Sequence, residues 1–187
     1  MRYAIALLAA LAALPAVAAD VFVSDPPHTM AHFQTGHLGI SWIHGSFRDV
    51  DAKVVLDRAA KQGSIEAVIK TASLDTGHEA RDKHVRSEDY LDVAKFPTMT
   101  YKSSKLRFDG ERLVGADGAL TLYGITRPVS LDIPQFRCIT HATRKVEVCD
   151  AEARTMIKRS EFGIKRGASA PLGDEVRITL QIEAYRQ

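Results

Sequence analysis

The chain has 187 residues, of which 45% are hydrophobic, so it is long enough for one compact domain with a sizeable core. Its 25 Lys and Arg residues against 23 Asp and Glu residues give a net charge of only +2. This balance offers no electrostatic reason to expect nucleic acid as a partner.

The first nineteen residues have the pattern of a cleavable signal peptide. Arg2 provides the positive end, residues 5–14 an apolar run, and the small residues after Pro15 a cleavage region, with cleavage after Ala18 or Ala19. The run is shorter than the about 20 residues that span a bilayer, and no later stretch is long enough. We expect export, no transmembrane segment in the mature chain, and a single domain over residues 20–187; an uncleaved N-terminal anchor is the alternative.

A period of two dominates the chain from Val21 onward. In residues 176–182, for example, Val, Ile and Leu alternate with Arg, Thr and Gln. This pattern is typical of strands with one dry and one wet face. With the turn signals between them, it predicts strands at residues 21–24, 30–38, 40–48, 51–57, 63–72, 97–108, 111–123, 126–137, 145–158 and 174–186.

Several of these strands are ten residues or longer, and closing the sheet is the simplest way to satisfy so many edges. We therefore expect a mainly β fold, an antiparallel barrel of about eight strands with one or two short helices between strands. A barrel of this size can enclose one small ligand. A sandwich is the alternative, because alternation alone does not distinguish the two.

Residues 74–104 depart from the period of two. Thr76 followed by Glu79 has the capping-box pattern, which predicts a helix from about residue 77 to 86. Two acidic and basic pairs at i,i+4 spacing support it, Glu79 with Lys83 and Asp82 with Arg86. Because so short a helix is marginal alone, we expect it to brace the barrel wall.

The two cysteines, Cys138 and Cys149, lie near facing ends of successive predicted strands. In an exported chain a disulfide is the first expectation, and it would pin this long hairpin. A metal pair or free thiols are the alternatives, which the missing CxxC spacing disfavours.

Several motifs together resemble the YceI-like family across the whole mature chain. In chain order they are Asp25-Pro26-Pro27-His28-Thr29, Phe33, His37-Leu38-Gly39-Ile40-Ser41, Gly45-Ser46-Phe47, Asp75-Thr76-Gly77, Arg81-Asp82-Lys83-His84-Val85-Arg86-Ser87, Lys95-Phe96-Pro97-Thr98, Tyr101-Lys102-Ser103, and the runs 118–129 and 157–164. The resemblance implies an extended lipocalin-like barrel with a helical segment, usually periplasmic. It also implies binding of polyisoprenoids or isoprenoid quinones inside the barrel. The cysteine pair departs from the family pattern, which leaves residues 136–150 without a detailed counterpart.

A polyprenyl tail needs a narrow dry tunnel, which inward apolar side chains provide. Our candidates for ligand binding are Phe33, His37, Phe47, Ile65, Ile69, Leu91, Phe96, Met99, Leu120, Leu122 and Phe162. For each of them the alternative is an ordinary structural role, core packing or, for His37, a hydrogen bond. For a polar head group or gate the candidates are Arg81, Asp82, His84, Lys158 and Arg159, and ion pairs or a solvated strand end are the alternatives.

Neither metal binding nor catalysis is predicted. His28 and His32 would be roughly 13 Å apart along a regular strand, too far to share one ion. The chain has no GxSxG, HExxH or glycine-rich phosphate motif. We therefore assign no catalytic residue, no metal ligand and no required cofactor other than a bound lipid.

The resulting hypothesis is a periplasmic protein that sequesters or carries an amphiphilic isoprenoid lipid, either a polyprenyl chain or an isoprenoid quinone. Two other hypotheses remain open, a periplasmic enzyme acting on such a lipid and a metal- or haem-associated stress protein. The sequence leaves open whether two copies form a homodimer.

Overall fold

Eleven strands and one α-helix form the part of the chain that the computed structural model describes, residues 19–169 and 172–187. The strands are β1 (Asp20–Ser24), β2 (Met30–His37), β3 (Ser41–Phe47), β4 (Val50–Asp57), β5 (Gln62–Lys70), β6 (Leu74–Asp75), β7 (Thr98–Asp109), β8 (Arg112–Leu122), β9 (Ile125–Thr140), β10 (Glu147–Lys158) and β11 (Glu175–Arg186). The helix is α1 (Glu79–Arg86), and the 3-10 turns are η1 (Pro26–His28), η2 (Thr71–Ser73) and η3 (Arg159–Phe162). Residues 1–18, most of the expected signal peptide, lie outside the described residues.

Eight of the strands close into an antiparallel barrel, which confirms the expected fold class. Their order is β1, β4, β5, β7, β8, β9, β10 and β11, and β11 pairs back with β1. Closure leaves no free edge along this part of the sheet, which is the physical reason for preferring a barrel to a sandwich. Each expected strand overlaps one in the structure; only the two-residue β6 was not predicted.

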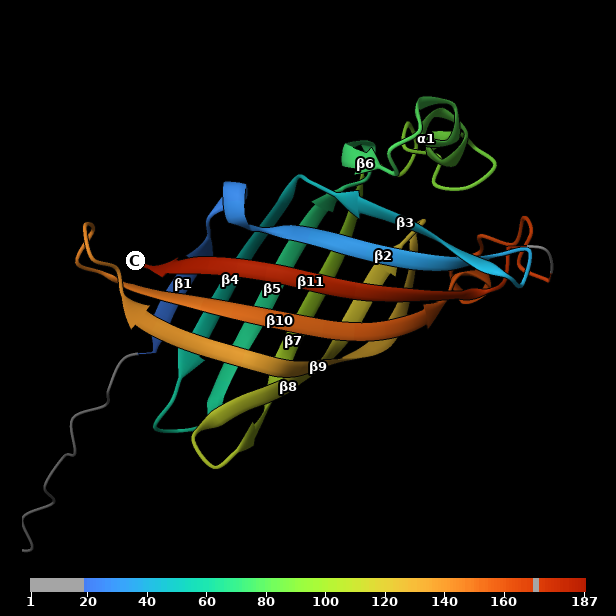
Figure 1. Ribbon diagram of the computed structural model, residues 1–187. Helices are drawn as coiled ribbons and strands as arrows, with labels where there is room; N and C mark the ends of the chain where they lie inside the picture. Colours follow the sequence, from blue (N-terminus) through green and yellow to red (C-terminus); the bar gives the residue numbers. More distant parts are fainter. Residues whose placement is uncertain (1–18, 170–171) are drawn as a thin grey trace, which may run out of the picture.

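Strands β2, β3 and β6 extend the sheet from β11. The first residues of β11 pair with β2 and its last residues pair with β1. The same edge of β11 is thus shared by β1 and β2, which follow one another in the chain. The β2–β3 hairpin, the segment between η3 and β11, and α1 lie toward the same end of the molecule (Figure 1). The cavity described below is lined by Arg81, His84 and Arg159 at this end.

The alternation along each strand places apolar side chains inside the barrel. On β11, Leu180 and Ala184 belong to the buried core, whereas Arg177 lies on the other face. At the end where β1 begins, Phe22 and Leu56 are each only 2% exposed. The interior is therefore filled at that end.

Helix α1 begins at Glu79 rather than near residue 77, because the predicted capping box does not form. The N-cap residue is His78, whose Nδ1 accepts a hydrogen bond from the Arg81 amide at 3.2 Å. Thr76 instead donates through its amide (2.9 Å) and its hydroxyl (2.5 Å) to one carboxylate oxygen of Asp82. The capping-box assignment was wrong.

The two expected ion pairs along α1 are also absent among the described residues. Asp82 faces Thr76, and the Arg86 guanidinium donates to the carbonyl of Leu74. The helix is thus held through the residues before it, which tie it to β6. None of the described helices is long and apolar enough to cross a membrane.

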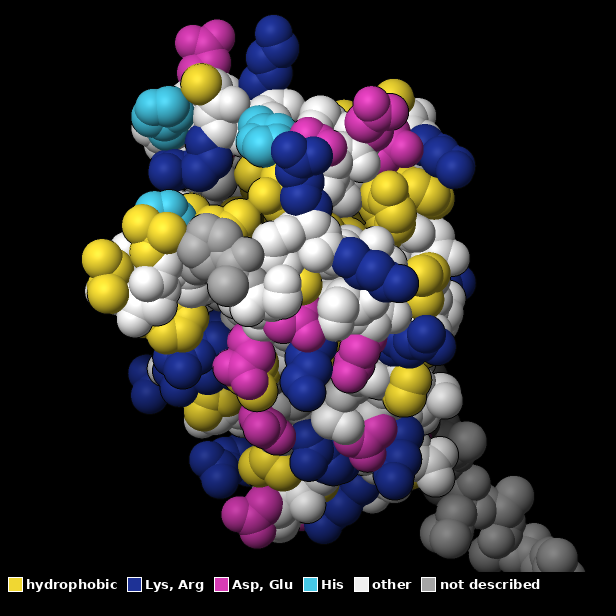
Figure 2. Space-filling model, turned by 90° about the vertical axis from the view of Figure 1, so that its right-hand side faces the viewer, with side chains coloured by type: hydrophobic (Ala, Val, Ile, Leu, Met, Phe, Trp, Pro, Cys, Tyr) yellow, Lys and Arg dark blue, Asp and Glu magenta, His cyan; other side chains and the backbone are white. Residues whose placement is uncertain are grey.

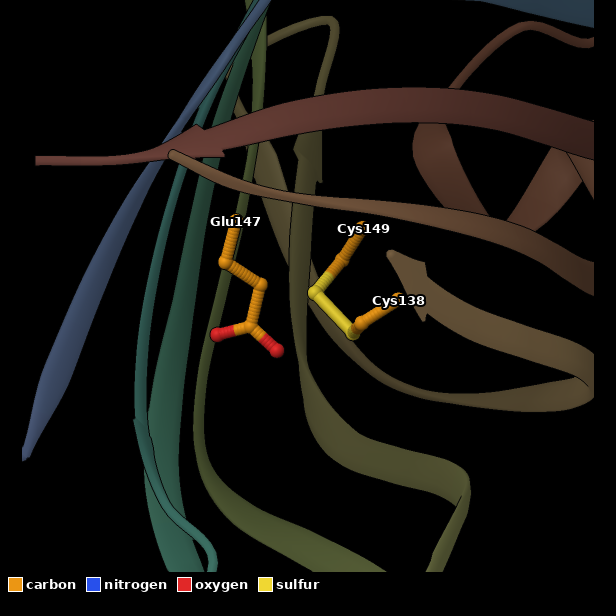
Figure 3. Close-up of side chains that lie close together, drawn as sticks. All are labelled: Cys138, Glu147 and Cys149. Carbon is orange, nitrogen blue, oxygen red and sulfur yellow. A yellow bond between two sulfur atoms is a disulfide. The ribbon is translucent and has the colours of Figure 1, made fainter. Parts of the chain in front are cut away.

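The predicted disulfide is confirmed. Cys138 on β9 and Cys149 on β10 are direct cross-strand partners, and their sulfur atoms are bonded (Figure 3). Beside them the Arg58 guanidinium donates to the Glu147 carboxylate at 2.9 Å. The disulfide therefore lies within regularly paired residues of the β9–β10 hairpin.

Candidate functional site

An apolar cavity of about 500 Å³ occupies the interior of the barrel. Strands β2 to β11 all contribute side chains to it, and α1 and the segment after η3 cover one end. Its apolar lining consists of Ala31, Phe33, Ile43, Phe47, Val54, Ile65, Ala67, Ile69, Leu74, Val85, Leu91, Met99, Leu113, Leu120, Leu122, Val129, Leu131, Ile133, Phe136, Ala151, Ala153, Ile157, Ile164, Leu172, Val176, Ile178, Leu180 and Ile182. The buried Phe22, Leu56 and Leu106 lie outside the lining, so the cavity does not run the full length of the core.

Most of the residues proposed from the sequence to contact a ligand do line this cavity. They are Phe33, His37, Phe47, Ile65, Ile69, Leu91, Met99, Leu120 and Leu122. Phe96 and Phe162 lie outside the lining: Phe96 packs against Tyr123 with ring centroids 4.5 Å apart, and Phe162 is 1% exposed within the solid core. Whether any lining residue contacts a ligand stays a prediction.

Phe33 shows how the local sequence shapes the wall. Its cross-strand partner is Gly45, and a Cβ atom at Gly45 would lie 2.4 Å from the Phe33 ring. Only glycine leaves room for the ring to lie flat against the neighbouring strand. The ring then packs against Phe47, with centroids 5.6 Å apart, and both rings face the cavity.

Several polar lining residues lie at the end covered by α1, whereas others, such as His32, Tyr101 and Thr155, lie on the barrel wall. Arg81 and His84 line the cavity, whereas Asp82 faces Thr76 instead. The Arg81 guanidinium donates to the hydroxyl (2.7 Å) and the carbonyl (2.8 Å) of Thr76, and His84 Nε2 lies 3.0 Å from an Asp89 carboxylate oxygen. Arg81 and His84 are thus fixed in orientation, each with part of its side chain on the cavity.

Arg159 is a buried cation in the lining at the same end. It is 7% exposed, and its guanidinium donates to the carbonyls of Gly173 (2.9 and 3.0 Å) and Arg166 (2.6 Å). These bonds hold the segment between η3 and β11 across the end of the barrel. Burial lowers the pKa of Arg159 below its ordinary value. Lys158, the neighbouring candidate, lies outside the lining.

Asp174 braces the same segment from the outside. Its carboxylate accepts hydrogen bonds from the amide (2.9 Å) and hydroxyl (2.7 Å) of Ser160. Burial raises the pKa of Asp174, but these bonds and the charge of Arg159 outweigh burial and leave it below its ordinary value. The carboxylate therefore stays ionised and holds the start of β11 against η3.

Sequence reasoning left much of the lining unnamed, and two of these contributions are informative. The first is Tyr101 on β7, whose hydroxyl donates to the carbonyls of Ala116 and Val129, both at 3.2 Å; burial raises its pKa to about 12. The second is the inward face of β11, residues 176–182. The alternation of β11 was visible in the sequence and was a sufficient signal to include it.

Among the described residues, two groups of side chains have metal-ligand composition, and neither matches the His28 and His32 pair considered above. Cys138, Glu147 and Cys149 form one, but the disulfide occupies both sulfur atoms (Figure 3). The other joins His28 with Asp25 and Glu183, with His28 Nδ1 2.6 Å from the Asp25 carboxylate. His28 lies in η1 rather than on a strand, so it meets these carboxylates and not His32.

Comparison with known sequences gives matches over nearly the whole chain. The model of the YceI-like domain matches residues 22–184. A UPF0312 protein of Azotobacter vinelandii is 36% identical over 183 residues, which covers 96% of this chain and 93% of that protein. Protein YceI of Escherichia coli O157:H7 is 36% identical over 177 residues, covering 92% and 90%.

Solved structures share the fold. The YCEI protein of Campylobacter jejuni superposes with a TM-score of 0.68 and 27% identity, covering 81% of this chain and 89% of that one. BcnA of Burkholderia cenocepacia gives 0.70 with 24% identity (86% and 98% covered). A polyisoprenoid binding domain from Saccharophagus degradans gives 0.64 with 14% identity (89% and 98% covered). At these two lower identities the likeness concerns the fold alone.

Proposed function

Because this chain belongs to the YceI-like domain family, we propose that it is an exported carrier that holds the tail of an amphiphilic isoprenoid lipid inside its barrel. The observation that carries the proposal is the apolar cavity of about 500 Å³. Its size falls in the roughly 300–1,000 Å³ range of small-molecule sites.

Energetics favour an occupant for such a cavity. The cavity is partly open, so without a ligand its apolar lining faces water or empty space. An apolar tail in the cavity gains about 0.8 kcal/mol for each buried CH₂ group.

The distribution of polar groups supports an amphiphile rather than a plain hydrocarbon. The two arginines of the described lining, Arg81 and Arg159, lie together with His84 at one end of a mainly apolar lining. A phosphate or quinone head group placed there meets cations and hydrogen-bond donors, while the tail extends toward β8 and β9. The Saccharophagus degradans domain of the same fold is described as polyisoprenoid binding, which is consistent with this class of ligand. The signal-peptide pattern of residues 1–19 favours the periplasm as the site of action.

The test is organic extraction and native mass spectrometry of the purified protein, followed by thermal unfolding with added polyprenyl phosphate or isoprenoid quinone. We expect a co-purifying lipid and a rise in Tm, because a ligand that binds only the folded state stabilises it by mass action. The same spectra give the N-terminal residue and so test cleavage after Ala18 or Ala19.

A cavity-filling variant sharpens this test. Ala153 on β10 is 4% exposed and lines the cavity, so Ala153→Phe places a ring where the tail would lie. Ala119→Phe on β8, which is not part of the lining, is the matched control. We expect Ala153→Phe to fold but lose the lipid and the Tm rise, and Ala119→Phe to keep both. A wild-type protein with neither a bound lipid nor a Tm rise would refute the carrier function.

A further inference from the structure

The tip of the β2–β3 hairpin carries an exposed apolar cluster. Within five residues, Leu38 is 53% exposed, Ile40 85% and Trp42 45%. The other large hydrophobic side chains that are exposed in the described part of the chain are Val23, Ile139, Val146 and Met156, each outside this hairpin. Apolar residues scattered singly over a surface are ordinary, whereas a cluster at the tip of one hairpin indicates an interaction surface.

At this tip, Leu38 has a left-handed backbone conformation that is unfavourable for a leucine. Leu38 has φ of 57° and the following Gly39 has φ of 70°, so two successive residues are left-handed. Asn-Gly is the usual pair in such a turn, because a bulky side chain is disfavoured there. Folding alone would therefore favour Asn at position 38. The leucine therefore costs some backbone strain and places its apolar side chain in solvent.

A cation accompanies the cluster. The Arg177 guanidinium carbon lies 4.4 Å from the centroid of the Trp42 ring, and Arg177 forms no ion pair with any described residue. Trp is favoured at the interface between lipid head groups and acyl chains, and an arginine beside it can reach a phosphate. Figure 2 views this end of the molecule: hydrophobic side chains protrude at its left edge, with Lys and Arg side chains gathered below them.

The same hairpin forms part of the cavity wall. His37, directly before the turn, and Ile43, shortly after it, both line the cavity, whereas Trp42 lies on the outer face. The exposed tip therefore adjoins the cavity wall. Docking there would bring the cavity close to the bilayer, which shortens the distance over which a tail is exposed to water during transfer.

We propose that the β2–β3 hairpin docks this end of the barrel onto the surface of a phospholipid bilayer. Leu38 and Ile40 enter the boundary between head groups and acyl chains, Trp42 lies at the level of the head groups, and Arg177 contacts lipid phosphate. This goes beyond the carrier function, because docking requires no lipid in the cavity.

Trp42 is the single tryptophan of the chain, so its emission reports directly on the tip. We would titrate the delipidated protein, purified after export, with vesicles of phosphatidylcholine and phosphatidylglycerol, and measure both the emission maximum and co-sedimentation. We expect a blue shift of the emission, binding to the vesicles, and weaker binding at high salt because the Arg177 contact is screened.

The decisive variant is Leu38→Asn with Ile40→Ser, which removes the apolar tip while asparagine relieves the left-handed strain. We expect its partitioning to be weaker by about tenfold or more. Ile139→Ser is the matched control, since Ile139 is 61% exposed but lies on β9, away from this hairpin, and its binding should be unchanged.

Three results would overturn the proposal. In the first, the wild type neither co-sediments with vesicles nor shows a blue-shifted emission. In the second, the double variant binds vesicles as tightly as the wild type, and in the third, Ile139→Ser weakens vesicle binding as much as the double variant does. Lipid retention, measured on the same samples, separates this outcome from the carrier function. A double variant that keeps its lipid but no longer binds vesicles supports docking. Vesicle binding by a protein that carries no lipid supports docking and refutes only the carrier function.

Discussion

Single residues decide how the interior of this barrel is divided between packing and cavity. Phe33 and Phe162 belong to the same chemical class, yet one lines the cavity and the other lies in solid core. The alternation of a strand predicts which face a residue occupies, but not its depth along the barrel or the shape of its neighbours. This is why most of the candidates chosen from the sequence line the cavity, whereas Phe96 and Phe162 do not and much of the lining was not named.

The cluster of His28, Asp25 and Glu183 has a pH dependence that can be worked out. The hydrogen bond to Asp25, together with the charge of Glu183, raises the pKa of His28 above its ordinary value of 6.5. A raised pKa means that the folded protein binds the proton more tightly than the unfolded chain. The stabilisation is therefore complete below the unfolded pKa and is lost as the pH rises through the folded pKa.

We expect His28→Gln to destabilise the protein at about pH 5.5 and to have a much smaller effect at about pH 8.5. Denaturant unfolding of wild type and variant across this range measures the difference. Asp25→Asn is the partner variant and should remove the same pH-dependent part. A difference that grows with pH would contradict the assignment.

At the scale of elements, the alternation of apolar and polar residues predicted the strands well, because one face of nearly every strand lies toward the barrel interior and the other toward solvent. It missed β6, since two residues are too few to show a period. It also misplaced the start of α1, because the N-cap is a histidine and the residues of the apparent capping box serve a tertiary contact instead. Signals of local structure fail where a side chain is used to tie one element to another.

Asp82 is that tie. It is 8% exposed and accepts two hydrogen bonds from Thr76. Asp82→Ala leaves both donors of Thr76 without their partner, and we expect a loss of about 1–3 kcal/mol in the free energy of unfolding. Asp82→Asn keeps an acceptor oxygen and should lose clearly less. Denaturant titration compares the two; equal losses would show that the charge, not the hydrogen bonds, matters.

The β9–β10 hairpin carries the disulfide, which closes a loop over a sequence separation of 11 residues. In the chain-entropy model a loop of this length contributes about 3 kcal/mol by restricting the unfolded chain. We expect the Cys138→Ser and Cys149→Ser double variant to fold with a lower free energy of unfolding, by about 2–3 kcal/mol. Unfolding with and without a reductant is the measurement, and reductant should leave the variant unchanged. A wild type insensitive to reductant would contradict this prediction.

At the scale of the whole molecule, the barrel and its covering end differ in how they are held. The strands form a closed hydrogen-bonded wall around the core, whereas α1 buries only Asp82 and is joined mainly through side-chain contacts. Stability should therefore be uneven, with the closed wall opening only when the whole protein unfolds. We therefore expect the end covered by α1, where a lipid would enter, to have the lowest free energy of local opening.

Hydrogen exchange tests this distribution. We expect amides of α1 to exchange through local opening, and central amides of β10 and β11 to exchange only at the free energy of global unfolding. Measurement by mass spectrometry at increasing denaturant distinguishes the two, because local opening depends little on denaturant. Protection of α1 equal to that of β11 would mean that the covering end and the wall open as one unit.

The pairing of β11 with β1 and with β2 has a consequence for how the chain is made. Strand β11, which completes the circle, follows all of its partners in the chain, so a nascent chain that stops before Glu175 exposes the open edges of β1, β2 and β10 at once. Such edges invite pairing with other chains. The protein thus stays vulnerable to aggregation until Glu175–Arg186 has been synthesised, and translation errors that remove β11 should be especially damaging.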